Sequence, residues 1–121
     1  MSQEEKRRSD RVIPAISEEE AVLVGVGTGK PALAKLIDFS ELGTLVYMLV
    51  QLESALAIGE TYTLTMYDQG SIFVIPSRVV RTNGHLVGFE FTSLSTATLH
   101  HVQSKLIRME VEWLRLSKTA N

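Results

Sequence analysis

The sequence predicts a mostly β protein, a six-stranded antiparallel β-barrel followed by one C-terminal amphipathic α-helix. Six or seven short apolar or alternating runs follow one another up to residue 91, joined by tight turns and without a helical pattern between them. Asn83-Gly84 is a strong hairpin signal, and from Ser95 the apolar spacing becomes helical. We expect three segments: a flexible arginine-bearing arm at 1–11, the barrel at 12–94 and the helix at 95–117.

Length and composition favour one domain. The chain has 121 residues and 45% hydrophobic content, enough to bury a core without a disulfide or a structural metal. With 12 basic and 14 acidic side chains and a net charge of −2, it has no global field that would attract a nucleic acid or an anionic membrane. The absence of cysteine removes disulfides, thiolate metal sites and thiol catalysis. An anion site must therefore be local.

The sequence also contains no recognisable membrane span or export signal. No apolar run approaches the ~20 residues of a membrane span, and the polar start of the chain lacks a hydrophobic segment of the signal-peptide type. We therefore expect a soluble cytoplasmic protein with no membrane insertion.

The strands are identified by alternation and by turn residues. In one of them Tyr62, Leu64 and Met66 share a face opposite threonines, which is typical of a half-buried strand. The connection 27–31 is rich in glycine and is expected to be a hairpin turn, and Pro76 is expected to bend its strand or to mark an edge. The expected strands cover 21–26, 32–37, 45–50, 61–67, 72–81 and 86–91, after an apolar run that begins at residue 12.

The C-terminal helix is predicted from apolar residues spaced three and four apart, with Ser95 or Thr96 as its N-cap. Ile107 and Leu114 are expected to widen this apolar stripe. We expect the stripe to pack on the mouth of the barrel. In the alternative, the last two turns around Trp113 extend to a partner chain. The stripe consists of Leu99, Val102, Leu106, Met109, Trp113 and Leu116.

Two polar clusters stand out from this framework. The first, residues 7–11, carries three arginines on a segment with no large apolar side chain, directly before the first apolar run. The second, residues 38–43, lies between two expected strands. There Asp38 and Ser40 can bond their own backbone two residues on, and Gly43 suits a positive φ or the close approach of another backbone.

Together the two clusters resemble the signatures of the PilZ domain family, written RxxxR and (D/N)xSxxG. Arg7 and Arg11 match the first signature, and Asp38, Ser40 and Gly43 match the second. The late hairpin, with its aliphatic-Gly-x-x-Phe run, is also similar, so the resemblance covers roughly residues 6 to 107, within a single domain at 6–117. It implies a six-stranded barrel with a C-terminal helix that binds the second messenger cyclic di-GMP.

The resemblance also implies roles for the matching residues. Arg7 and Arg11 are expected on guanine edges and phosphates, with Arg8 as an additional stacking or phosphate contact, since a guanidinium can do both. Asp38 is expected to accept from guanine N1–H or N2–H₂. Ser40 is expected to bond a phosphate or to fix the turn, and Gly43 to contribute backbone geometry.

The mobile arm suggests how the signal is passed on. Binding is expected to order the arm and to create a surface for a downstream protein partner, and a homodimer could form through the helix or the ligand. Lys6, just before the first motif arginine, leaves open whether one or two ligands bind.

Three other functions remain as alternatives. The first is a ligand-free PilZ-fold scaffold that acts by protein–protein interaction, for example in pilus or motility machinery. An enzyme is disfavoured because His85, His100 and His101 form no constellation with a nucleophile or a chelating pair, so surface histidines are expected and no metal or cofactor. A nucleic-acid-binding barrel is disfavoured by the balanced charge.

Overall fold

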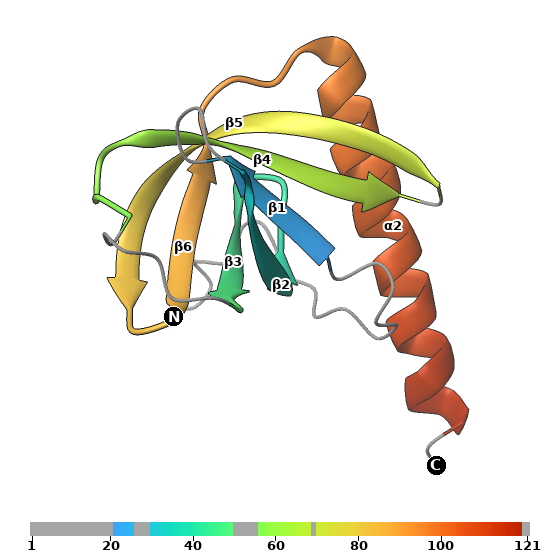
Figure 1. The fold of residues 1–121 in the computed structure, drawn as a ribbon. Coiled ribbons are helices and arrows are strands. Elements are labelled where there is room, and N and C mark those ends of the chain that lie inside the picture. The colour runs from blue at the N-terminus through green and yellow to red at the C-terminus, as the bar shows by residue number, and fades with distance from the viewer. Residues whose placement is uncertain (1–20, 26–29, 50–55, 69, 120–121) are drawn as a thin grey trace, which may run out of the picture.

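The computed structural model describes residues 21–25, 30–49, 56–68 and 70–119, and its side chains up to residue 115. Within these residues the chain forms six strands and one long helix (Figure 1). The elements are β1 (Ala21–Gly25), β2 (Ala32–Phe39), β3 (Gly43–Met48), β4 (Thr61–Asp68), β5 (Ser71–Asn83), β6 (Leu86–Phe91) and α2 (Thr96–Thr119). The expected arm at 1–11 and the apolar run after it lie outside the described residues.

The six strands close into a barrel in the order β1-β2-β3-β6-β5-β4, and every neighbouring pair is antiparallel. The predicted fold class is therefore confirmed. Two hairpins turn at glycines with positive φ, Gly70 at 85° and Gly84 at 62°, a conformation that glycine adopts without a steric penalty. The pairing of β5 with β6 begins only at Ser77, so at Pro76 β5 has β4 as its one neighbouring strand, which agrees with the expected edge position. Pro76 lies inside β5, opposite Thr63.

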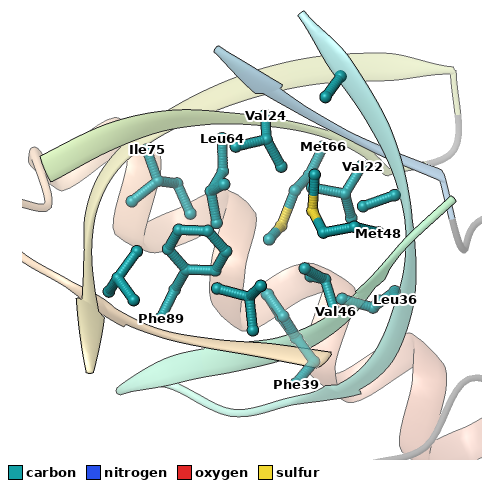
Figure 2. Close-up of a cluster of buried hydrophobic side chains, with 14 of the residues drawn as sticks. Val22, Val24, Leu36, Phe39, Val46, Met48, Leu64, Met66, Ile75 and Phe89 are labelled. Atoms are coloured by element: carbon teal, nitrogen blue, oxygen red, sulfur yellow. The ribbon is translucent and has the colours of Figure 1, made fainter. Parts of the chain in front are cut away.

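Alternate side chains of the strands fill the barrel. Along β4, Leu64 and Met66 are fully buried while the threonines between them are exposed or half-buried, as period-2 alternation requires. Each buried aliphatic or aromatic side chain contributes about 1.5–3 kcal/mol relative to an exposed one. Figure 2 shows this interior, in which the side chains converge from all around the barrel: Val22, Val24, Leu36, Phe39, Val46, Met48, Leu64, Met66, Ile75 and Phe89.

Helix α2 is capped as predicted and packs against β4 and β5. The Ser95 Oγ accepts a hydrogen bond from Thr98 N at 3.1 Å, the geometry of an N-cap. Val102 and Met109 are buried on the barrel side. Lys105 is also fully buried, and its Nζ donates to Tyr67 O at 2.6 Å.

The outer face of α2 differs from the prediction. Trp113, which was expected in the buried stripe, is 47% exposed. Ile107 and Leu114 are 60% and 66% exposed, so the expectation that they widen the buried stripe is wrong. At about 100° per residue they lie on the opposite side of the helix from Val102 and Met109. The helix has 24 residues, or ~36 Å, and its C-terminal end continues past the strands (Figure 1). None of the described helices is long and apolar enough to cross a membrane.

Candidate ligand-binding site

The connection between β2 and β3 is a tight turn built around Ser40. The Ser40 side chain is fully buried, and its Oγ accepts from Leu42 N at 3.2 Å and from Gly43 N at 3.3 Å. Ser40 N in turn donates to Gly43 O at 2.9 Å. The hydroxyl therefore replaces backbone partners in the turn, as serine does in such motifs, and fixes the chain direction immediately after Asp38.

Gly43 is required by the close approach of β3 and β6. A Cβ atom at this position would lie 2.0 Å from Phe89 O and 3.2 Å from Glu90 Cα. The φ of Gly43 is not in the positive range, so space rather than backbone conformation selects glycine here. Gly43 thus allows β3 to pair with β6 directly beside the Ser40 turn.

Asp38 is aimed outward by a β-bulge. The pairing of β2 with β3 shifts between Leu36 and Asp38, so Ile37 is an extra residue. Leu36 and Phe39 are both buried in the core, whereas Ile37 and Asp38 are half-buried. Without the extra residue, alternation would turn Asp38 into the barrel and Phe39 out of it; bulges re-aim side chains in this way.

The Asp38 group is held by β3. Its Oδ1 accepts from Leu45 N at 3.2 Å, and its carbonyl oxygen accepts from Thr44 Oγ1 at 2.6 Å. A carboxylate that is oriented by a backbone N–H offers acceptor oxygens in a defined direction. The structure therefore places a negatively charged acceptor at a fixed point on the outer surface of the barrel.

A cation lies on the same outer row of the sheet. Asp38 pairs with Leu45, Leu45 with Gly88, and Gly88 with Arg81, across β2, β3, β6 and β5. A Cβ on Gly88 would lie 2.9 Å from Arg81 Cγ and 3.0 Å from Arg81 Nε. The Arg81 side chain therefore crosses over Gly88, from β5 toward the strands that carry Asp38.

Sequence reasoning missed Arg81 as a site residue. Phe73, Ile75 and Val79 all face the core, and continued alternation would place Arg81 inside the barrel. A second bulge, between Val79 and Arg81, turns it outward instead. One signal in the sequence was available: Arg81 is charged, yet it occupies a position that strict alternation along the strand would turn into the core. A charged residue at such a position indicates a bulge in the pairing.

Arg81 differs from its neighbour Arg78 in its partners. Arg78 forms an ion pair with Glu90 on β6. Within the part of the chain that the structure describes, the side chain of Arg81 forms no hydrogen bond or ion pair. Its guanidinium is thus available to an anion or to a base edge.

The structure brings Asp38, Ser40 and Gly43 together at the β2–β3 connection, with Asp38 near the end of β2, Ser40 in the turn and Gly43 at the start of β3. Arg7, Arg8 and Arg11 lie outside the described residues. The histidines are not all on the surface as expected: the His85 ring stacks on Tyr47 and its Nδ1 lies 2.6 Å from Met48 O, and His101 stacks on Phe73. Among the described residues, no group of three or more His, Asp or Glu side chains is placed to hold a metal.

A model of a known protein family matches most of the chain. The PilZ domain model matches residues 5–108, and the chain belongs to the PilZ domain family. No curated protein sequence matches it.

Three solved structures are similar in fold. The PilZ domain of YcgR from Escherichia coli with c-di-GMP has a TM-score of 0.77 and 13% identity, over 93% of this chain and 98% of that chain. YcgR from Escherichia coli in complex with c-di-GMP has a TM-score of 0.69 and 16% identity, over 96% of this chain and 51% of that chain. An uncharacterized Legionella protein, Lpg0364, has a TM-score of 0.52 and 13% identity, over 91% of this chain and 98% of that chain.

Proposed function

We propose that this chain is a cyclic di-GMP receptor module and that the messenger lies on the outer face of β2, β3 and β6. The observation that carries the proposal is the outward-aimed Asp38 beside the buried Ser40 turn, in a chain of the PilZ family. Two structural neighbours, both of YcgR, contain c-di-GMP. Membership of the family and the local geometry support the same ligand.

The chemistry of the ligand fits the residues of this face. Cyclic di-GMP has two phosphates and two guanines, so its receptor needs fixed positive charge and acceptors for the guanine donors. Asp38 can accept from guanine N1–H and N2–H₂ because Leu45 N holds its carboxylate in place. Ser40 acts through the turn, since its hydroxyl is already engaged by Leu42 N and Gly43 N.

The positive charge comes first from the arm. Arg7 and Arg11 bind guanine O6 and N7 or phosphate oxygens in this proposal, and Arg8 adds a stacking or phosphate contact. The arm folds across the face that presents Asp38 when the ligand binds. Ordering such a segment costs about 2–5 kcal/mol, and the ordered arm then forms a new surface for a downstream protein partner.

Arg81 supplies a further cation from the barrel itself. Three strand spacings of about 4.8 Å separate β5 from β2 along the sheet, and the Arg81 side chain shortens this span because it crosses Gly88. A guanidinium at that point can grip a phosphate or the Hoogsteen edge of the guanine whose other edge meets Asp38. The ligand would then be held by Asp38 on one side of this face, by Arg81 on the other side, and by the arm that covers it.

Calorimetry with three nucleotides tests the proposal. We expect cyclic di-GMP to bind, and cyclic di-AMP and GTP to bind far more weakly, because each bidentate arginine–guanine pair gives about 1–3 kcal/mol of discrimination. Asp38→Ala and Arg7→Ala should each weaken binding, while Lys30→Ala, at an exposed position, should not. No binding of any of the three nucleotides would overturn the proposal and favour a scaffold that acts by protein–protein interaction.

A further inference from the structure

Helix α2 carries a second apolar stripe that the barrel does not cover. Ile107, Val111 and Leu114 are 60%, 57% and 66% exposed. Their spacing of four and three residues aligns them on one side of the helix. This side lies about 140–160° around the helix axis from Val102 and Met109, at about 100° per residue. The exposed side of α2 thus has apolar residues at the spacing that is typical of a helix–helix interface.

The spacing fits a heptad repeat of the kind found in coiled coils. If Ile107, Val111 and Leu114 occupy positions d, a and d, then Glu110 occupies g and Arg115 occupies e. In a parallel pair of helices, a g residue meets the e residue five positions later on the partner. Glu110 and Arg115 have that spacing and opposite charges. Arg115 also forms an ion pair with Glu112 of its own helix, and an exposed pair of this kind contributes little enough to be shared with Glu110 of the partner.

An antiparallel pair would bring like charges together. With Val111 at the centre of the crossing, e positions meet e positions and g positions meet g positions. Arg108 at position e already pairs with Asp68 of the barrel, so the repulsion falls on position g. Glu110 would lie beside Glu110 of the partner, and like charges across such a seam are unfavourable. The charges flanking the stripe therefore select the parallel orientation.

The barrel leaves room for this arrangement. It is attached to α2 through the buried side chains Val102, Lys105 and Met109, on the side away from the exposed stripe, and through the ion pair of Arg108 with Asp68. The C-terminal end of the helix also continues past the strands (Figure 1). Two helices can thus meet along the stripe with their barrels on the outside.

We infer that two copies of this chain pair through parallel α2 helices, with Ile107, Val111 and Leu114 packed against their equivalents and Glu110 beside Arg115 of the partner. The seam is shorter than the three to four heptads of a stable coiled coil. The dimer is therefore weak, with a Kd on the order of 10–100 µM.

Cross-linking tests the orientation, because the chain has no native cysteine. In the parallel pair each seam residue faces its own equivalent, so Ile107→Cys and Leu114→Cys should each form a symmetric disulfide dimer under mild oxidation. Lys30→Cys, which is exposed outside the helix, sets the background rate. A cross-link that forms only when the Ile107→Cys and Leu114→Cys chains are mixed would show an antiparallel pair and overturn the inference.

Sedimentation equilibrium of charge variants gives a second, independent readout. Glu110→Arg and Arg115→Glu should each weaken the dimer about threefold to tenfold, since each places like charges together. The double variant should recover the parental Kd because it restores opposite charges. Monomers for the parent chain at millimolar concentration, or no recovery in the double variant, would contradict the inference. Circular dichroism confirms that each variant keeps its fold, which is expected because both residues are exposed.

Discussion

Gly88 lies directly beneath the side chain of Arg81. The Cγ and Nε atoms of Arg81 are 2.9 Å and 3.0 Å from the point that a Cβ on residue 88 would occupy. The glycine therefore permits the arginine to lie flat across β6, which directs the guanidinium toward the side of the sheet that carries Asp38.

This relationship predicts a loss of ligand affinity when either residue is changed. Arg81→Ala should weaken cyclic di-GMP binding about 5- to 150-fold, the equivalent of one bidentate contact of about 1–3 kcal/mol. Gly88→Ala should weaken it in the same direction, because the new methyl group displaces the arginine. Calorimetry measures both.

The matched control is Arg78→Ala, two residues before the bulge on the same strand and paired with Glu90. It should bind with an affinity close to that of the parent chain. Equal losses for Arg78→Ala and Arg81→Ala would assign the effect to general charge rather than to the position of Arg81.

Gly43→Ala should destabilise the fold. The added Cβ would lie 2.0 Å from Phe89 O, a backbone atom that cannot move without disrupting the pairing of β3 and β6. We expect the free energy of unfolding to fall by about 3 kcal/mol, at the upper end of the usual cost of overpacking. Urea denaturation measures this loss.

The comparison variant is Gly88→Ala, in which the new methyl group meets only a flexible side chain. Its loss of stability should be clearly smaller than that of Gly43→Ala. If both variants unfolded at the same urea concentration, the close approach of the two backbones at Gly43 would not be the constraint that the structure indicates.

Ser40→Ala should weaken both the fold and the ligand site. Removal of the buried Oγ leaves Leu42 N and Gly43 N without the acceptor that the structure shows. Such a loss costs about 1–3 kcal/mol of stability, and it also loosens the segment that positions Asp38. Thermal denaturation and calorimetry on the same samples separate the two effects, and binding at parental affinity would show that the turn does not position Asp38.

Asp68 of β4 connects the barrel to α2 through an ion pair with Arg108. This carboxylate is 6% exposed and accepts from Arg108 Nε at 3.0 Å. Asp68→Ala should lower the free energy of unfolding by about 1–3 kcal/mol, because the half-buried arginine loses a charged partner. Hydrogen exchange should rise in α2 more than in β2 and β3, and a uniform rise would contradict a local role for the contact.

The sequence was sufficient for the succession of the described strands along the chain, for the Asn83-Gly84 hairpin and for the helix cap, because alternation, turn residues and Ser95 are local signals. It was also sufficient to group Asp38, Ser40 and Gly43, which lie at the end of β2, in the turn and at the start of β3. It did not place Arg81, because that placement depends on a bulge in the pairing of β5 with β6. A bulge is a property of two strands, and one strand's pattern does not locate it.

The helix gives a second example of this limit. Ile107 and Leu114 are apolar and lie among the residues of the buried stripe in the sequence, so the sequence alone predicts that they join that stripe. Only the position of the barrel shows that they face away from it. An apolar periodicity predicts that one face of a helix is buried, but it does not identify the element or the protein that buries it.

Hydrogen exchange with and without cyclic di-GMP tests the central claim most directly. If the messenger is clasped between the arm and the outer face of the barrel, saturating ligand should slow exchange in residues 1–11 and in residues 38–43 together, and should leave β4 unchanged. Unchanged exchange in residues 1–11 while the ligand is demonstrably bound would contradict the account.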